Sequence, residues 1–245
     1  MKFISKLLRF AWAVYFLICF LVFFILFYPL FLVFLSRKEW YPHAHRLRGI
    51  WGAILMILTG IFPSVKFEEK LNRRGTYVFA PNHFSYLDIV TVNVLIPVYF
   101  NFMAKADLAR IPVFGIFFRT IDIPVERGSS TASHKAFLEA DRRLKQGVSM
   151  LIFPEGRIGD KVPYMSNFKV GAFRLAIENK VPIVPISILD NYKRMESGGL
   201  TDGGTPGRMR IIVHKPIQVD NLTLDDIPAL QKQVYDIIDF PLRKP

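Results

Sequence analysis

Residues 76–95 read TYVFAPNHFSYLDIVTVNVL. The first part, Thr76–Ala80, is a short apolar run with the residue types that favour strands, and Ser85–Leu95 is expected to form a helix. A buried strand that passes through a short polar turn into a helix is the repeating unit of α/β proteins. This stretch therefore predicts an α/β domain.

The alternation of short β-rich runs and helical runs continues to the end of the chain. Expected strands are Thr76–Ala80, Tyr99–Ala104, Thr120–Val125, Ser149–Pro154, Val181–Ile188 and Met209–His214. Expected helices are Ser85–Leu95, Thr131–Gln146, Phe168–Asn179 and Asp226–Phe240. Several strands are almost continuously apolar, as strands buried on both faces are. We expect a mixed, largely parallel sheet flanked by helices over residues 65–245. Five glycines between residues 198 and 207 predict a mobile surface loop.

The N-terminal quarter has a different character. No residue from Phe10 to Ser36 is charged, and these 27 positions exceed the ~20 that a helix needs to cross a hydrocarbon core. Basic residues flank the run on both sides. We interpret residues 1–64 as membrane-anchoring helices that precede the α/β domain.

A second uncharged run, Gly49 to Val65, is marginal in length for a membrane span. Its most apolar part, Ile50 to Phe62, would give roughly 20 Å of helix against a core of ~30 Å. Two architectures fit: a single transmembrane helix, or a helical hairpin that enters one leaflet. The basic flanks at both ends favour the hairpin, since both ends then lie on one anionic surface.

The net charge of +12 points to an anionic partner. Residues 1–64 hold seven basic residues and one acidic residue, so half of this excess adjoins the apolar anchor. That placement favours anionic lipid over nucleic acid. Cys19 is the only cysteine, which excludes an internal disulfide and a cysteine zinc site. The sequence also lacks a P-loop and the histidine spacing of a metal site, so we expect no nucleic acid partner and no metal.

The first candidate for chemistry is His83 with Asp88, an H-x-x-x-x-D spacing after the first expected strand. Five positions along one helix turn the side chains ~140° apart, so the two can meet only if His83 precedes the helix. Ser85 and Asp88 have capping-box spacing, which would start the helix at Ser85. His83 could then act as a base that Asp88 orients. The alternative is that Asp88 only caps the helix and His83 is a polar turn residue.

The second group of candidates follows other strands. Phe153, Pro154, Glu155, Gly156 and Arg157 leave an apolar run and enter a turn, at the kind of strand end where α/β folds bind ligands. Lys105 and Arg127 also follow expected strands, and Asp122 lies near Arg127. Together with Arg157, these cations could clamp a phosphate. Singly, each could be a solvated surface charge, and Glu155 could simply pair with a cation.

Taken in order, these motifs resemble the glycerolipid acyltransferase family that includes lysophosphatidic acid acyltransferase (1-acyl-sn-glycerol-3-phosphate acyltransferase). The blocks that carry the resemblance are Asn82-His83 with Asp88, Lys105 through Pro112 and Gly115 to Arg127, Phe153 to Gly156, Phe168 to Ala172, and Val181 to Ile186. The third block departs from the family pattern FPEG-Thr-Arg-Ser, because here Arg157 follows Gly156 directly.

The resemblance implies a glycerol-phosphate acyltransferase-like fold and the transfer of a fatty acyl chain to lysophosphatidic acid, giving phosphatidic acid for phospholipid synthesis. The donor would be a thioester of acyl carrier protein or coenzyme A, with no other cofactor. The implied residues are His83 and Asp88 in catalysis, Lys105, Arg127, Glu155, Gly156 and Arg157 in substrate binding, and Asn82, Ser85, Phe153 and Pro154 in support.

Other functions remain open at this point. The acceptor could be glycerol 3-phosphate, another lysophospholipid or a lyso-aminolipid. A non-catalytic module that binds membranes would need neither His83 nor Asp88. We expect the protein at a membrane, with its active site on the cytoplasmic face of a bacterial inner membrane.

Overall fold

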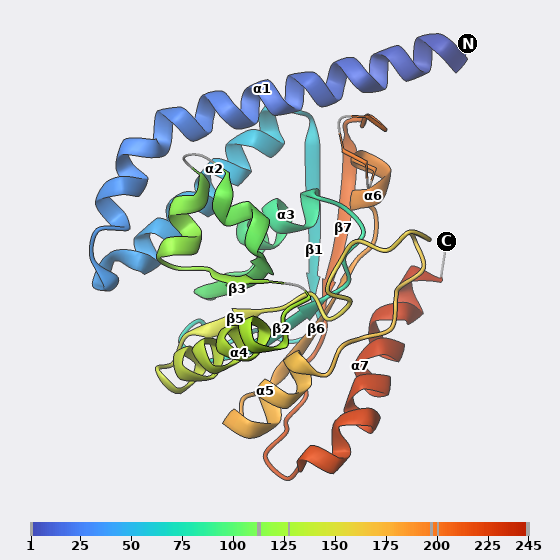
Figure 1. Ribbon diagram of the computed structural model, residues 1–245. Helices are drawn as coiled ribbons and strands as arrows, with labels where there is room; N and C mark the ends of the chain where they lie inside the picture. Colours follow the sequence, from blue (N-terminus) through green and yellow to red (C-terminus); the bar gives the residue numbers. More distant parts are fainter. Residues whose placement is uncertain (1, 112–113, 127, 197, 200, 244–245) are drawn as a thin grey trace.

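A computed structural model describes residues 2–111, 114–126, 128–196, 198–199 and 201–243 (Figure 1). Its centre is one seven-stranded sheet with the order β1-β7-β6-β2-β5-β3-β4. The strands are β1 Ile61–Phe67, β2 Val78–Pro81, β3 Phe100–Lys105, β4 Ile123–Val125, β5 Ser149–Leu151, β6 Ile183–Ile188 and β7 Gly207–Val213. The strands from β6 to β4 are parallel, whereas β7 is antiparallel to β6 and parallel to β1. The predicted mixed, largely parallel sheet is confirmed.

Helices cover both faces of this sheet (Figure 1). The helices are α1 Lys2–Phe34, α2 Tyr41–Leu58, α3 Leu87–Leu95, α4 Ser130–Lys145, α5 Gly171–Asn179, α6 Asn191–Arg194 and α7 Ile227–Leu242. Short 3-10 helices are η1 Lys38–Trp40, η2 Ala106–Arg110, η3 Phe114–Arg119 and η4 Leu224–Asp226. Helices α4, α5 and α7 lie on one face, and α3 and α2 lie on the other, with α1 outside α2.

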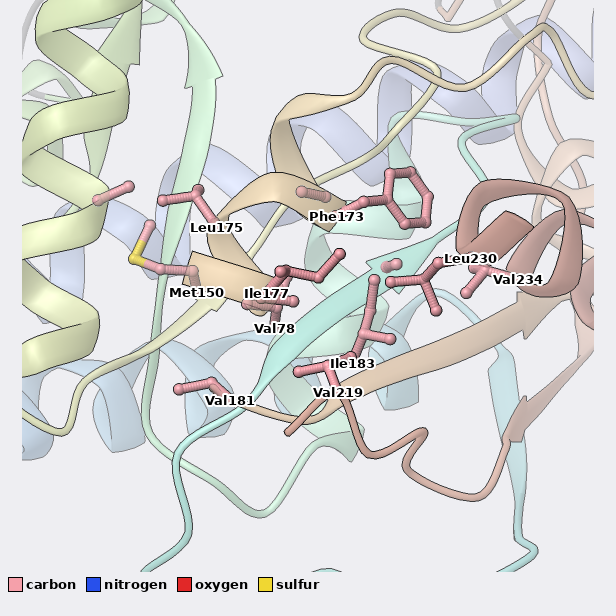
Figure 2. Packing of buried hydrophobic residues seen from close by; sticks show 14 of the residues in the cluster. Val78, Met150, Phe173, Leu175, Ile177, Val181, Ile183, Val219, Leu230 and Val234 are labelled. Atoms are coloured by element: carbon pink, nitrogen blue, oxygen red, sulfur yellow. The ribbon is translucent and has the colours of Figure 1, made fainter. Parts of the chain in front are cut away.

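The alternation of side chains along β2 explains the two layers. Val78 and Ala80 are fully buried against the α4, α5 and α7 side, where Figure 2 shows Val78 among Phe173 and Ile183. Phe79, also fully buried, belongs to the cluster on the opposite face. Successive strand residues point to opposite faces, so a strand that is apolar at every position must be covered on both sides.

Helices α1 and α2 form an antiparallel hairpin. The Trp12 indole N–H donates to the Thr59 carbonyl at 3.0 Å, near one end of the hairpin. Phe24 contacts Trp51 in its middle, with ring centroids 5.1 Å apart. Within the described chain, α1 is the one helix long and apolar enough to cross a membrane, with a mean hydropathy of 2.9 in its most apolar window. Only 22% of that window is buried, so one side of α1 packs on the protein and the rest is apolar and exposed.

The first strand was missed in the sequence. Residues 49–65 predict one apolar helical run, but α2 ends at Leu58 and β1 begins at Ile61. Gly60 lies between them with φ +69°, the left-handed conformation that commonly ends a helix. Pro63 is tolerated within β1 because β1 is an edge strand. The sheet therefore starts before residue 65, where the sequence placed the domain boundary.

The glycine-rich segment is not a free surface loop in its described part. Gly203 and Gly204 are buried against α1, and the Gly204 N–H donates to the Arg9 carbonyl at 3.1 Å. A Cβ atom on Gly204 would lie 2.3 Å from the Trp12 ring, so only glycine permits this approach. An ion pair between Arg9 and Glu196 fixes the same contact.

A buried ion pair joins the hairpin to the sheet. Arg48 of α2 donates to Asp122, just before β4, at 2.7 Å, and both side chains are less than 7% exposed. The second oxygen of Asp122 accepts the Phe102 N–H at 2.9 Å. Burial raises the pKa of Asp122, and the Arg48 guanidinium opposes that shift. Removing one partner leaves the other charge buried without a counter-charge.

We expect the Asp122→Leu variant to lose about 3–5 kcal/mol of unfolding free energy, because Arg48 would stay buried without its counter-charge. The double variant Arg48→Met/Asp122→Leu should recover most of the loss. Denaturant unfolding in detergent micelles would measure both, with Arg142→Ala, which breaks an exposed pair with Glu139, as a control that costs under about 1 kcal/mol. An Asp122→Leu effect as small as that control would contradict the expectation.

Candidate active site

Three neighbouring parallel strands end at the same edge of the sheet. His83 follows β2, Glu155 follows β5, and Asn191 follows β6. Strands β5 and β6 both pair with β2, one on each side. The carboxyl ends of parallel strands are where α/β proteins bind ligands, because the connecting turns converge there. The three residues come from distant parts of the sequence and meet at one point.

His83 and Asp88 form the hydrogen-bonded pair that their spacing predicts. The His83 Nδ1 atom lies 3.0 Å from Asp88 Oδ2. Asp88 is fully buried, and the His83 side chain is 12% exposed and stacks on Phe153, with ring centroids 4.0 Å apart. Because a carboxylate only accepts hydrogen bonds, the proton sits on Nδ1 and Nε2 is left to accept a proton. This arrangement orients an imidazole as a base.

The helix begins differently from the prediction. It starts at Leu87, and its N-cap is Tyr86 rather than Ser85. Asp88 Oδ2 still reaches back to the Ser85 N–H at 2.9 Å, as in a capping box, and accepts the Phe84 N–H at 2.8 Å. The Ser85 hydroxyl instead donates to the Met195 carbonyl at 2.8 Å. Asp88 Oδ2 thus accepts from the backbone of the turn and also contacts the His83 ring, so the capping contact and the His83–Asp88 pair are both present.

Glu155 accepts a hydrogen bond from the backbone of the same turn. Its carboxylate accepts the His83 backbone N–H at 2.8 Å and the Ser166 N–H at 2.7 Å, one on each oxygen. The side chain is 3% exposed, and no pairing with Arg157 is recorded in the described residues. Burial raises the pKa of Glu155, and the two backbone N–H groups oppose that shift. Glu155 therefore fixes the backbone that carries the histidine.

A cavity of about 1030 Å³ opens beside His83. The part lined by the hairpin, α3 and β3, which we call the inner part, is largely apolar, with Phe20, Trp51, Leu55 and Phe118 in its wall. The ion pair of Arg48 and Asp122 also lines this inner part. The wall of the cavity thus contains residues of both the expected anchor and the α/β domain.

The outer part of the cavity holds cations. Lys105 is exposed and pairs with Asp107, and Arg157 is exposed and pairs with Asp160 at 3.2 Å. Lys169 also lines the cavity and has no acidic partner within the described part of the chain. Its side chain lies against Gly156, whose φ is +74° and where a Cβ atom would come within 2.9 Å of the lysine. Arg127, expected to bind phosphate, lies outside the described residues, as does Pro112.

The remaining predicted residues contact the protein backbone or the His83 ring. Asn82 is fully buried and exchanges two hydrogen bonds with the Ile188 backbone, which fixes β2 against β6. Phe153 supports the His83 ring, and the Pro154 carbonyl accepts the Lys169 N–H at 2.8 Å. Across the described ranges, no group of three or more His, Cys, Asp or Glu side chains is placed to hold a metal ion.

Three residues of the site were missed from the sequence. Lys169 follows no expected strand, because the sequence placed it in the helix Phe168–Asn179, although it belongs to a block that carried the family resemblance. In the structure it lies in the loop before α5, which begins at Gly171. Asn191 donates to Asp88 Oδ1 at 2.9 Å, and its position just after an expected strand could have indicated it. Arg48, in the expected anchor, gave no signal that it would enter the cavity.

Known proteins with similar sequences are acyltransferases. The sequence model of the Acyltransferase family matches residues 63–189. The chain is 32% identical over 181 residues to the chloroplastic 1-acyl-sn-glycerol-3-phosphate acyltransferase BAT2 of Brassica napus, with 71% of this chain and 50% of that protein covered. It is 25% identical over 191 residues to the 1-acyl-sn-glycerol-3-phosphate acyltransferase of Haemophilus influenzae, with 77% and 78% covered.

The fold is also found in a solved structure. The crystal structure of the 1-acyl-sn-glycerophosphate acyltransferase PlsC from Thermotoga maritima superposes with a TM-score of 0.80 at 22% identity, covering 100% of this chain and 97% of that one. The chain spans about half the length of the chloroplast relatives it matches. Because the family model covers more than half of its residues, the chain belongs to the acyltransferase family.

Proposed function

We propose that the protein transfers a fatty acyl chain from an acyl thioester to the free hydroxyl of lysophosphatidic acid, giving phosphatidic acid. The observation that carries this proposal is the His83 Nδ1 contact with buried Asp88, 3.0 Å long, at the side of a largely apolar cavity. The names of the relatives support the same acceptor. The thioester of acyl carrier protein or coenzyme A is a co-substrate, and the reaction uses no further cofactor.

The reaction proceeds in one step of acyl transfer. His83 Nε2 takes the proton of the acceptor hydroxyl while that oxygen attacks the thioester carbonyl carbon. The carbon–sulfur bond breaks, and the departing thiolate takes from the imidazolium the proton that the acceptor hydroxyl gave up; Asp88 stabilises the imidazolium until then. Cys19 lies buried in α1 and the sequence has no G-x-S-x-G motif to offer a serine nucleophile, so the proposed step needs no acyl-enzyme.

The inner part of the cavity is the place for an acyl chain. Its apolar wall would shield the chain from water, at about 0.8 kcal/mol for each buried CH₂ group. The Arg48–Asp122 ion pair lies in the wall of that inner part, and a methylene group packed against these charged groups offers them no hydrogen bond, which makes the contact unfavourable. We therefore expect an upper limit on the length of the transferred chain.

Purified protein in detergent should form phosphatidic acid from lysophosphatidic acid with at least one donor, acyl carrier protein thioester or coenzyme A thioester. A series of donors with increasing chain length should show a sharp upper limit. His83→Ala should reduce kcat by roughly a thousandfold or more, because the base is removed. Lys232→Ala, on the exposed side of α7, is the matched control and should leave turnover unchanged.

The other functions make different predictions in this assay. Acylation of glycerol 3-phosphate, another lysophospholipid or a lyso-aminolipid in preference to lysophosphatidic acid would replace the acceptor and keep the chemistry. Near-normal turnover of His83→Ala would refute the mechanism. If no acceptor is acylated in a His83-dependent way, the non-catalytic membrane-binding module replaces the proposal.

The phosphate of the acceptor is bound by the cations at the outer part of the cavity. Lys105, Arg157 and Lys169 line that part, and Arg127 is assigned to the same role from the family motif. Asp107 and Asp160 neutralise two of these cations before the substrate enters. Glu155 and Gly156 shape the turn beside them.

Arg127→Ala and Lys169→Ala should each raise KM for lysophosphatidic acid about tenfold or more, which corresponds to one charge-assisted hydrogen bond of roughly 1.5–3 kcal/mol. The KM for the thioester should change less. Steady-state kinetics against Lys232→Ala would measure this difference. An acceptor KM equal to that of the control would remove the residue from the phosphate site.

The α1–α2 hairpin lies in one leaflet, with the active site on the cytoplasmic face of a bacterial inner membrane. Helix α1 packs along the protein instead of projecting from it, and the apolar side that it exposes includes Phe3, Leu21 and Val33. The basic residues near both of its ends suit one anionic surface. A hairpin in one leaflet places the cavity beside the lipids that carry the acceptor.

A labelling experiment separates this arrangement from a spanning helix. In a Cys19→Ser background, single cysteines placed at Ser5 and at Ser36 mark the two ends of α1. In sealed vesicles, a membrane-impermeant maleimide should label both positions from the same side. Labelling of the two ends from opposite sides would show that α1 crosses the bilayer.

A further inference from the structure

Asn191 occupies a third strand end beside the His83–Asp88 pair. It is the first residue of α6 and follows β6, whose neighbour β2 leads into His83. Its side chain is fully buried and donates to Asp88 Oδ1 at 2.9 Å. The other oxygen of Asp88 is used by His83, Phe84 and Ser85. Within the described residues, Asn191 is therefore the hydrogen-bond donor to the carboxylate oxygen that does not contact the histidine.

The orientation of the Asn191 amide is determined by its donors. The Nδ2 atom donates to Asp88 Oδ1 and, at 3.0 Å, to the Thr91 hydroxyl. The Thr91 hydroxyl itself donates to the Leu87 carbonyl, so toward Asn191 it can only accept. The Oδ1 atom of Asn191 is buried with no hydrogen-bond partner in the described structure. A buried acceptor without a partner is unfavourable for folding. The Asn191 amide nevertheless keeps this orientation, in which Nδ2 makes both of its hydrogen bonds to α3, the helix that carries Asp88.

The backbone around Asn191 is fixed on both sides. The preceding residue, Asp190, is held by the guanidinium of Arg210 through two contacts of 2.6 and 3.0 Å. Further along, the Met195 N–H donates to the Asn191 carbonyl at 2.9 Å, and the Met195 carbonyl accepts the Ser85 hydroxyl. The amide is thus held in place before any substrate binds, as a group that orients another must be.

We infer that Asn191 is a positioning residue for acyl transfer, acting on the reaction through Asp88 and touching no substrate. Its N–H group keeps the Asp88 carboxylate in the plane that directs Oδ2 at His83 Nδ1. Without it the carboxylate can rotate about its bond to Cβ, and the imidazole loses the orientation that presents Nε2 to the acceptor hydroxyl. This role rests on the proposed function for its kinetic test.

Asn191→Ala should lower kcat roughly tenfold to a hundredfold and leave both KM values nearly unchanged, since one hydrogen bond to a charged group is lost. The matched control is Asn101→Ala, which removes another buried asparagine, bonded to Tyr99 and Arg143 away from the cavity. The control should lower stability without lowering the kcat of the folded protein. If Asn191→Ala reduces activity only in step with its loss of folded protein, the inference is overturned.

Asn191→Asp tests the positioning role through the pH dependence of kcat, which a purely structural role would not change. The new carboxyl has nearly the same shape, but it donates to Asp88 Oδ1 only when protonated, and when ionised it repels Asp88. The charged and titratable groups around it are Asp88, His83, Asp190 and Arg210. The kcat of the variant, divided by that of the wild type at each pH, should therefore rise as the pH falls. A ratio independent of pH would count against the inference.

A measurement without substrate keeps this inference separate from the proposed function. The His83 Nδ1 proton, shared with Asp88, should give a low-field proton resonance in detergent micelles that is absent in His83→Gln. Asn191→Ala should broaden this resonance or speed its exchange with water, whereas Asn101→Ala should not. An unchanged resonance overturns the role of Asn191. A wild-type protein that shows the resonance but acylates no acceptor refutes the function alone.

Discussion

The structure depends on the Asp88 carboxylate and the four hydrogen bonds that it accepts. Oδ2 binds the His83 ring and the N–H groups of Phe84 and Ser85, and Oδ1 binds Asn191. A fully buried carboxylate is tolerated only with such partners. The same contacts close the turn between β2 and α3, start the helix and fix the histidine tautomer. Local folding and chemistry therefore rely on one side chain.

This arrangement requires the parallel sheet. Strands β6, β2 and β5 are adjacent, so their connecting turns bring His83, Glu155 and Asn191 together although Glu155 lies 72 positions after His83 and Asn191 lies further still along the chain. Glu155 holds the backbone of His83, and Asn191 holds the carboxylate that orients its ring. The pair is thus contacted by two groups that each follow a strand of the sheet, which positions them before any ligand binds.

Much of the domain could be predicted because its strands are short, apolar and bounded by turns. The strand β1 could not, since Ile61–Phe67 continues the apolar character of α2 and contains a proline. His83 and Asp88 were accessible because their geometry is local to one turn. Arg48 and Asp122 are 74 positions apart, and their pairing depends on how the hairpin packs on the sheet. Spacing along the sequence carries no information about such a contact.

The hairpin of α1 and α2, residues 2–58, contributes side chains to the cavity beside His83 and is not a separate tether. Phe20 of α1 and Trp51 and Leu55 of α2 form part of the cavity wall, and Leu55 is fully buried. The contact of α1 with the glycine-rich segment leads through Met195 to Ser85, next to the histidine. The proposed site for an acyl chain needs walls that exclude water, and apolar residues of the hairpin form one of these walls. The elements that would hold the protein at a membrane are therefore the same elements that complete the pocket, so the cavity beside His83 is complete only when the hairpin is folded against the sheet.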